Sequence, residues 1–279
     1  MERRYTLPAG YAEALLDRES PFSIEPLVRF IGPMTSALPS LLNAYRTGGG
    51  VAWDEFGPEA IEAQGDFNRP WLRSDFGSSY LPSVPDLHTR LSDEKNSARV
   101  ADVACGVGWA AIALAKAYPN ITVDGFDLDD YSIQLARKNA AETGVADRVT
   151  FEARDAADPA NAGKYDFALI VEALHDMSNP VGALRAVEKM LKPDGVAMVV
   201  DERVQDVFTA PADETDRFMY AVSFLVCLPA GLADTPSAGT GTVIRSSTLT
   251  RYANEAGFAK VTVLDQIEHP FLRFYRLER

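Results

Sequence analysis

Short β-rich runs alternate with helical segments between residues 97 and 200, and this alternation constrains the fold more than any other feature of the sequence. The helical segments carry apolar residues at three- and four-residue spacing, which is the period of a helix that packs on one side. Strands and helices in this order predict right-handed crossovers and a parallel sheet that is covered on both faces. The expected strands span residues 98–104, 121–127, 148–155, 165–171 and 195–201.

The regions on either side of this alternation have a different pattern. Residues 1–95 contain amphipathic helical segments joined by glycines and Pro-rich turns, which indicate a helical N-terminal lid or spacer. Residues 96–279 are expected to form the main domain, with a cap inserted at about 205–245. The last two β-rich runs, separated at Pro270, could pair as an antiparallel hairpin. The expected fold class is therefore α/β: a Rossmann-like, doubly wound seven-stranded sheet, mostly parallel with an antiparallel edge hairpin, plus the helical N-terminal lid.

Charge and composition exclude several classes of partner. The chain has 40 acidic and 27 basic residues and a net charge of -13, which repels phosphate backbones and anionic lipid. We therefore expect no nucleic acid and no membrane as partner, and a small molecule instead. Cys105 and Cys227 lie far apart in sequence, so neither a disulfide framework nor a zinc cluster is expected. With no apolar signal segment at the N-terminus, this predicts a cytoplasmic protein that holds no metal, and it leaves the oligomeric state open.

A glycine-containing turn, with the sequence DVACGVGW over residues 102–109, joins the first expected strand to the first helix. Glycines there let backbone N–H groups approach a ligand, and the helix N-terminus favours negative charge. Gly106, Gly108 and Ala111 match the dinucleotide-binding pattern, and Asp127 follows at roughly the ~20-residue distance of a ribose-binding acid. An NAD-dependent dehydrogenase is therefore one interpretation of the turn.

Two further acids favour a different ligand. Asp102 would place a carboxylate beside the turn, which suits a cationic sulfonium amino acid better than a pyrophosphate. Asp155 ends the third expected strand, where a carboxylate can accept a hydrogen bond from an adenine amine. Asp127 and Asp155 each have a structural alternative. Asp127 could cap the helix that begins near Asp129, and Asp155 could be a turn residue.

With these acids at successive strand ends, the chain resembles the class I S-adenosylmethionine-dependent methyltransferases. The segments ADVACGVGWAAIALA, VDGFDLD, VEALHDM, PSAGTGTV and HPFLRFYRL are similar to those of bacterial small-molecule methyltransferases that carry an N-terminal winged-helix module. The start of the chain, YTLPAGYAEAL, is similar to the end of that module, so the rest of the module is expected to be absent. The resemblance implies S-adenosylmethionine as cofactor, bound by Asp102, Ala104, Gly106, Gly108, Asp127, Leu128, Asp155 and Ala156. Ala104 stands where the loop often has a glycine, a replacement that requires a negative φ.

His175 lies just past the fourth expected strand, at the carboxyl edge of the sheet where doubly wound folds bind ligands. Its unperturbed pKa near ~6.5 would let it accept a proton at neutral pH. Small-molecule O-methyltransferases similar to this sequence place a His–Asp pair there, which implies a catalytic base; the alternative is that His175 caps a helix or shapes the pocket. Glu172 on the same edge is a second catalytic candidate or a surface acid. Asp201, at the end of the fifth expected strand, could meet a polar part of the substrate, but a solvated loop is favoured.

The cap segment 216–228 is apolar on nearly every face, which predicts that it is buried between layers or against a ligand. Met219, Tyr220 and Phe224 are expected to line an apolar substrate pocket, with core packing as the alternative. The sequence thus predicts an enzyme, an S-adenosylmethionine-dependent methyltransferase that acts on a small, largely apolar molecule at a hydroxyl oxygen. The alternatives are a non-methylating S-adenosylmethionine enzyme that catalyses cyclisation, a cofactor-binding sensor and, less favoured, an NAD dehydrogenase.

Overall fold

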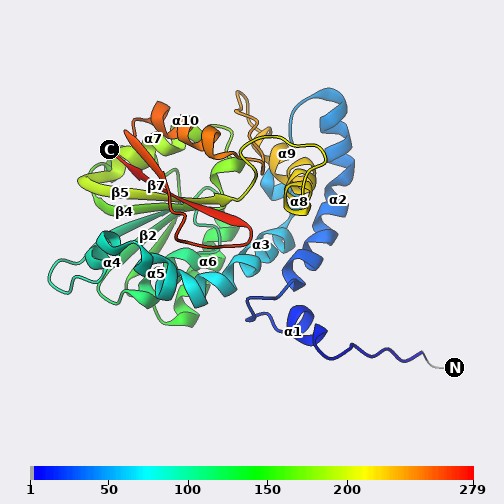
Figure 1. Ribbon diagram of the computed structural model, residues 1–279, viewed down its shortest axis with the longest axis horizontal. Helices are drawn as coiled ribbons and strands as arrows, with labels where there is room; N and C mark the ends of the chain where they lie inside the picture. Colours follow the sequence, from blue (N-terminus) through cyan, green and yellow to red (C-terminus); the bar gives the residue numbers. More distant parts are fainter. Residues whose placement is uncertain (1–2) are drawn as a thin grey trace.

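A seven-stranded sheet in the order β3-β2-β1-β4-β5-β7-β6 forms the centre of the computed structural model, which describes residues 3–279 (Figure 1). The first five strands pair in parallel, and β7 is antiparallel to both β5 and β6. The predicted fold class, including the antiparallel hairpin at the edge, is confirmed. The strands are β1 (Arg99–Val103), β2 (Thr122–Asp127), β3 (Val149–Ala153), β4 (Tyr165–Val171), β5 (Leu191–Glu202), β6 (Lys260–Val263) and β7 (Leu272–Glu278).

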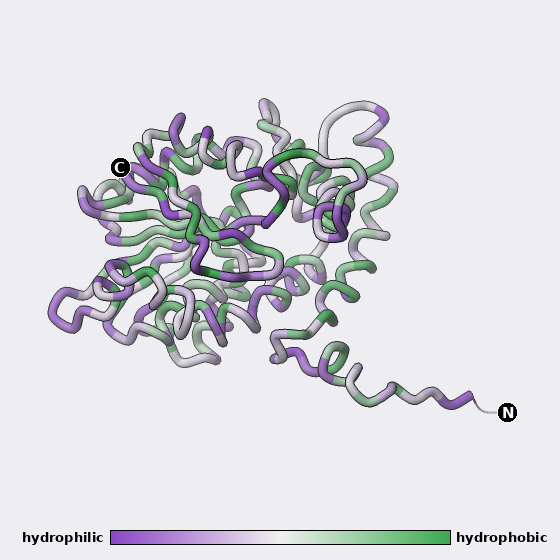
Figure 2. Tube along the Cα trace, in the orientation of Figure 1, coloured by the Kyte–Doolittle hydropathy of each residue, from purple (hydrophilic) through white to green (hydrophobic). Residues whose placement is uncertain are grey.

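Helices cover both faces of the sheet, as the alternating pattern predicts. On one face α5 (Trp109–Ala117) and α6 (Asp130–Thr143) contribute to a buried apolar cluster, and on the other face α7 (Pro180–Met190) and α10 (Ser246–Ala256) contribute to a second one. Strand β4 is buried along almost its whole length because it lies between these layers. Figure 2 shows hydrophobic stretches along the central strands and hydrophilic stretches in the loops that join them.

The start and the end of α6 illustrate how local sequence sets these elements. Oδ2 of Asp129 accepts a hydrogen bond from the backbone N–H of Ser132, which caps the helix. Gly144 ends the helix in a left-handed conformation with φ 70°, which glycine adopts without strain. Asp129, and not Asp127, is therefore the residue that caps this helix.

The described part of residues 1–95 is mainly helical. Its first helices lie away from the sheet, and its later helices pack beside the sheet (Figure 1). Helix α2 stands apart from the sheet, and α3 returns from it toward the strand ends (Figure 1). Gly65 of α3 permits a close approach, because a Cβ atom there would lie 2.2 Å from Cγ2 of Val107 in the glycine-containing turn. The segment comprises α1 (Tyr11–Leu16), α2 (Glu25–Thr47), η1 (Trp53–Phe56), α3 (Pro58–Trp71), η2 (Leu72–Tyr80), η3 (Leu81–Ser83) and α4 (Pro85–Leu91). The division into a lid and a main domain at residue 95 stays a prediction.

The segment after β5 forms a helical cap through α8 (Glu214–Val222), η6 (Ser223–Cys227) and α9 (Leu228–Gly231). Apolar side chains of η6 pack in one cluster with side chains of α2, so the cap and α2 support each other. Among residues 3–279, α2 included, no helix combines the length and the apolar composition needed to cross a bilayer.

Candidate active site

His175 lies in η5 (Leu174–Asp176), a single helical turn that follows β4, and its side chain is buried. Nδ1 of His175 is 2.6 Å from Oδ1 of Asp201, which lies on the adjacent strand β5 and is 0% exposed. Because β4 and β5 run in parallel, their carboxyl ends bring the two side chains to one edge of the sheet. A carboxylate can only accept, so Nδ1 donates and the ring presents Nε2 on its other side.

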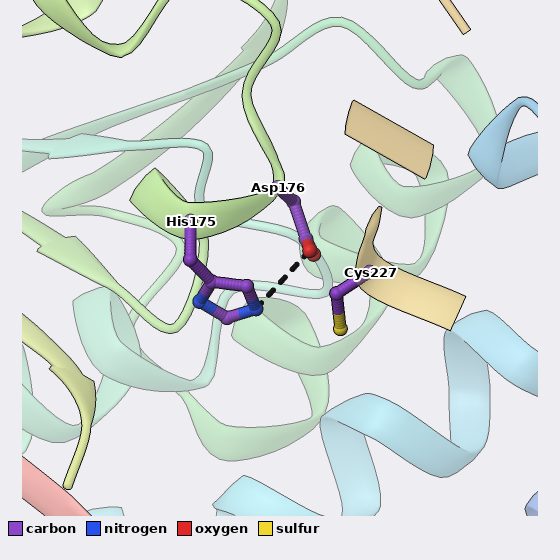
Figure 3. Close-up of side chains that lie close together, drawn as sticks. All are labelled: His175, Asp176 and Cys227. Carbon is purple, nitrogen blue, oxygen red and sulfur yellow. Dashed lines mark ion pairs between the residues drawn. The ribbon is translucent and has the colours of Figure 1, made fainter. Parts of the chain in front are cut away.

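Asp176 and Cys227 lie on the Nε2 side of the ring (Figure 3). Oδ1 of Asp176 is 3.1 Å from Nε2, and Cys227 reaches the group from η6 of the cap. The ligand atoms of His175, Asp176 and Cys227 all lie within 4.8 Å of one another, so within residues 3–279 this group could hold a metal ion. Asp176 and Cys227 thus lie beside Nε2, the nitrogen that would accept a proton in base catalysis.

The charge on His175 follows from these neighbours. Burial by itself would lower the pKa of the ring, but the carboxylates of Asp176 and Asp201 raise it well above its usual range. Both carboxylates therefore favour the protonated form of the imidazole, and only the unprotonated Nε2 can act as a base.

Glu172, directly after β4, links the sheet edge to α3. Its Oε2 accepts hydrogen bonds from Nε2 of Gln64, at 2.9 Å, and from Nδ2 of Asn68. Burial raises the pKa of Glu172 to about 7, although the hydrogen bond from Asn68 and the charge of His175 act in the opposite direction. The backbone has φ 47°, a left-handed conformation that costs a non-glycine residue about 1–3 kcal/mol. Burial and the carboxylate of Glu172 also raise the pKa of Glu202 on β5.

Three residues of the glycine loop adopt positive φ: Ala104 at 56°, Gly106 at 50° and Gly108 at 84°. The expectation of a negative φ at Ala104 is wrong, and the left-handed alanine costs roughly 1–2 kcal/mol because its Cβ approaches the carbonyl oxygen. Two features require a glycine at position 108: its positive φ, and the ring of Phe151, which would lie 2.5 Å from a Cβ atom there. The backbone N–H of Gly106 donates to Oδ2 of Asp127 at 2.8 Å, which ties the loop to the end of β2.

Asp102 and Asp127 are both held by backbone N–H groups. Oδ2 of Asp102 accepts from the N–H of Ala111 in the first turn of α5, and Oδ1 of Asp127 accepts from the N–H of Asp129. Burial raises the pKa of Asp102 to about 7, with a further contribution from the charge of Asp127. Asp102 is fully buried beneath the loop, so it contacts the backbone of the loop and not open space.

The third predicted acid, Asp155, is exposed beyond the end of β3. Its Oδ1 accepts from the backbone N–H of Ala157 at 2.8 Å, so it forms the turn that the sequence offered as an alternative. The neighbouring Ala156 is buried, whereas Leu128 after β2 is 78% exposed.

Comparison with known proteins decides the family. A family described as methyltransferase domain matches residues 94–257, which is more than half of the chain. The chain belongs to this methyltransferase family. A ubiquinone biosynthesis O-methyltransferase of Thiobacillus denitrificans is 28% identical to this methyltransferase over 186 residues, which cover 64% of the chain and 72% of that relative.

Solved structures of methyltransferases share the fold at low sequence identity. An O-methyltransferase family protein from Burkholderia thailandensis matches with a TM-score of 0.66 and 18% identity, covering 97% of this chain and 76% of that one. Human N-acetylserotonin methyltransferase, solved in complex with SAM, matches with a TM-score of 0.64 and 16% identity, covering 97% and 74%. These matches confirm the fold of the methyltransferase. The family match confirms the prediction of an enzyme that is an S-adenosylmethionine-dependent methyltransferase.

The glycine loop and the end of β2 fit the nucleoside part of that cofactor. A Cβ atom on Gly106 would meet no other atom within 4 Å, so the loop backbone is open on that side. Asp127 lies next to this opening through its hydrogen bond to Gly106. The carboxylate of Asp127 keeps lone pairs for further donors after its two backbone hydrogen bonds, since each oxygen can accept more than one.

The predicted substrate residues of the methyltransferase lie in different surroundings within the cap. Met219 is buried, and the hydroxyl of Tyr220 accepts a hydrogen bond from Nη2 of Arg245 at 2.9 Å. Phe224 is 53% exposed and stacks on Tyr45 of α2, with ring centroids 4.4 Å apart. Phe224 thus has a partner on α2 that the sequence did not indicate, and its role in substrate choice stays a prediction.

Three residues at this edge were not predicted. Asp201 was expected in a solvated loop, which is wrong because β5 extends through Glu202 and buries it. The continuous apolar run before Asp201 was a signal for such burial. Gln64 and Asn68 on α3 carry a weaker signal, since they are four residues apart and therefore share one helix face.

Proposed function

We propose that the chain transfers the methyl group of S-adenosylmethionine to a hydroxyl oxygen of a small, largely apolar molecule, with His175 as the base. The observation that carries this proposal is the buried pair of His175 and Asp201, which orients Nε2 at the edge of the sheet where doubly wound folds bind ligands. The oxygen acceptor is supported by relatives named as ubiquinone biosynthesis O-methyltransferases.

We infer that the glycine loop holds the cofactor through its backbone, with Gly106 and Gly108 permitting close approach. Asp127 accepts hydrogen bonds from the ribose hydroxyls, and Leu128 and Ala156 contact the adenine. Asp102 supports the loop from below by accepting a hydrogen bond from the backbone N–H of Ala111. Ala104 belongs to the same turn, and Asp155 lies in a separate turn just beyond β3.

S-adenosylmethionine, when bound, supplies a methyl group on a positively charged sulfur that is open to in-line attack. The protein has to align the acceptor and remove its proton. A phenol with a pKa near ~10 keeps its proton at neutral pH, so Nε2 of His175 takes that proton as the oxygen attacks. Asp201 holds the ring in place through Nδ1 and stabilises the imidazolium that forms.

Alignment and exclusion of water fall to the elements around the pair. Glu172 is fixed by Gln64 and Asn68, which holds α3 against the strand ends. Met219 and Cys227 of the cap are buried and present apolar or weakly polar surface. Such positioning can lower a barrier by about 7–11 kcal/mol in favourable cases.

The proposal is tested by incubating the protein with methyl-labelled S-adenosylmethionine and a panel of phenols, thiols, amines and carbon acids of matched size. We expect label on the oxygen of at least one phenol. Label found only on nitrogen, sulfur or carbon would overturn the hydroxyl acceptor. Breakdown of the cofactor without any methylated product would favour cyclisation, and tight binding without breakdown would favour a sensor.

A further inference from the structure

Helix α2 carries apolar side chains on two separate faces. The inner face packs against η1, α3 and the cap through Ala37, Leu41 and Ala44. The outer face points away from the sheet, at the edge of the molecule in Figure 1. Its apolar side chains are between 41% and 55% exposed, and they are Ile24, Val28, Ile31, Leu38, Leu42 and Tyr45. So many exposed apolar side chains on one face of a helix indicate a contact surface.

These side chains, together with Thr35, form an outer row with the spacing of a coiled coil. From Ile24 to Tyr45 the intervals are four, three, four, three, four and three residues. This is the heptad spacing at which two helices insert side chains between those of the other. The helix contains two prolines and is nevertheless continuous, so the outer row extends over about 32 Å. The outer row therefore fits a second helix with the same spacing.

The polar residue of the outer row is compatible with burial in an interface. The hydroxyl of Thr35 donates a hydrogen bond to the carbonyl oxygen of Ile31 at 2.8 Å, within the same helix. Burial of Thr35 therefore leaves no unpaired hydrogen-bond donor. Thr35 lies near the middle of the outer row, where a polar side chain can fix the register of two paired helices.

Two charges beside the outer row favour an antiparallel partner of the same sequence. Glu25 and Arg46 each follow a residue of the outer row directly, so they occupy equivalent heptad positions at opposite ends of the helix. In an antiparallel pair these positions face each other, and Glu25 of one copy meets Arg46 of the other. Arg46 is exposed and has no hydrogen-bond or ion-pair partner within residues 3–279. Antiparallel helices also bring the opposite ends of their dipoles together.

We propose that two copies of this chain pair through their outer rows, with the α2 helices antiparallel about a two-fold axis near Thr35 and Leu38. Each contact then occurs twice, because the same surface of both copies forms the interface. Ile31 of one copy packs against Leu42 of the other in this register. The pairing goes beyond the proposed function and does not depend on it.

The second copy also reaches the cap. Tyr45 stacks on Phe224 with ring centroids 4.4 Å apart, and its hydroxyl donates to the carbonyl oxygen of Phe224 at 2.7 Å. Because Phe224 is 53% exposed, a helix that covers Tyr45 covers part of Phe224 as well. The interface therefore extends from α2 onto the cap of each copy.

The first test follows the molar mass of the whole chain against concentration by sedimentation equilibrium. We expect a reversible dimer of the natural protein. Ile31→Glu combined with Leu42→Glu places charges in both halves of the outer row and should weaken the dimer about a hundredfold or more. Val207→Glu, at an apolar residue that is 71% exposed outside α2, is the matched control and should leave the dimer unchanged.

Three outcomes of this test would overturn the pairing. They are a natural protein that stays monomeric at every concentration, a dimer that survives both glutamates, and a dimer that Val207→Glu weakens equally. Circular dichroism and melting curves show whether the double variant keeps its fold, which we expect because both replaced side chains are about half exposed. A monomer that binds vesicles of uncharged phosphatidylcholine would assign the outer row to a lipid surface instead.

The second test determines the orientation of the two helices with a short bis-maleimide linker. Cys105 and Cys227 are buried, so the linker reaches a cysteine introduced in the outer row more readily. Ile31→Cys and a mass-tagged Leu42→Cys are prepared separately and then mixed. We expect links mainly between the two variants, because antiparallel helices bring positions 31 and 42 together. Preferential linking of each variant to itself would show a parallel pair and contradict the proposed arrangement. Neither test uses cofactor or acceptor, so both are independent of the proposed activity.

Discussion

Nδ1 of His175 and Oδ1 of Asp201 lie 2.6 Å apart, although 26 residues separate them in the chain. Adjacent parallel strands bring them together, and both side chains are buried. In such a setting the carboxylate selects the orientation and the tautomer of the ring. The orientation of the His175 ring, on which its proposed role as a base depends, is therefore set by a residue of β5.

This dependence predicts the behaviour of two variants. His175→Gln should lower kcat for a hydroxyl acceptor by about 10²–10⁴-fold while cofactor affinity stays within a few-fold. Asp201→Asn should cause a large loss of its own, and the double variant should lose little more than His175→Gln alone, because the two residues act as a unit. Steady-state kinetics with calorimetry of cofactor binding provide the measurement. Fully additive losses would show that Asp201 acts independently of His175.

Asp127 and Asp155 make a matched pair for testing the cofactor site. Asp127 lies beside the open face of the glycine loop, whereas Asp155 is an exposed turn residue. Asp127→Ala should weaken cofactor binding by about 1.5–3 kcal/mol through the loss of charged hydrogen bonds. Asp155→Ala should have a clearly smaller effect in the same calorimetric titration. Equal effects, or none for Asp127→Ala, would contradict the assigned cofactor site.

Asp102 predicts a pH-dependent change in stability. Its pKa is raised from 3.8 to about 7 in the folded protein, so the folded state binds the proton more tightly than the unfolded state does. The free energy of unfolding should then fall as the pH rises between these two values, and Asp102→Asn should lack that fall. Denaturant unfolding near about pH 5 and about pH 8 measures the difference between variant and natural protein, which should favour the variant more at the higher pH. A difference that does not change with pH would contradict the raised pKa.

Variants of Met219 and Phe224 can show which of these two cap residues contacts the methyl acceptor. Met219 is buried and Phe224 is half exposed against Tyr45. If the acceptor site lies on the inner side of the cap, Met219→Ala should change KM for a bulky phenol more than Phe224→Ala does. Cofactor affinity and the melting temperature of each variant serve as controls. A dominant effect of Phe224→Ala on KM would restore the substrate role that the sequence suggests for it.

We expect that added metal ions inhibit methyl transfer and that their removal does not change it. Proton removal by Nε2 of His175 needs no Lewis acid, so we expect that a chelator leaves methyl transfer unchanged. Added Zn²⁺ should inhibit, because His175, Asp176 and Cys227 offer nitrogen, oxygen and sulfur ligands within 4.8 Å and the ion would occupy the base. Cys227→Ser should weaken that inhibition, whereas Cys105→Ser should not. Loss of activity on chelation would show that the metal-free mechanism is wrong.

The sequence predicts the fold well because its signals are local. Alternating strand and helix patterns place the glycine loop and His175 at the same edge of the sheet, and the structure agrees. The backbone of Ala104 was not predictable, because a left-handed alanine is stable only when the surrounding loop enforces it.

The residues that complete the site depend on tertiary contacts. Gln64 and Asn68 reach Glu172 across more than a hundred residues of sequence, and only the approach of α3 to the glycine loop makes this contact possible. Asp201 was misplaced for a related reason, since the burial of a strand end is decided by the neighbouring elements. Periodicity can place Gln64 and Asn68 on one helix face and indicate that a strand is buried, but it does not identify the partner that either group contacts.

The contact between Gly65 and Val107 limits how this enzyme can diverge. A side chain at position 65 would overlap Val107, so α3 cannot carry a larger residue there. A shift of α3 away from the glycine loop would break the hydrogen bond from Gln64 to Glu172. Substitutions that adapt the enzyme to acceptors of other sizes are therefore expected in the cap, where Met219 is buried. Descendants of this chain with different acceptors should vary in the cap and keep a glycine at position 65.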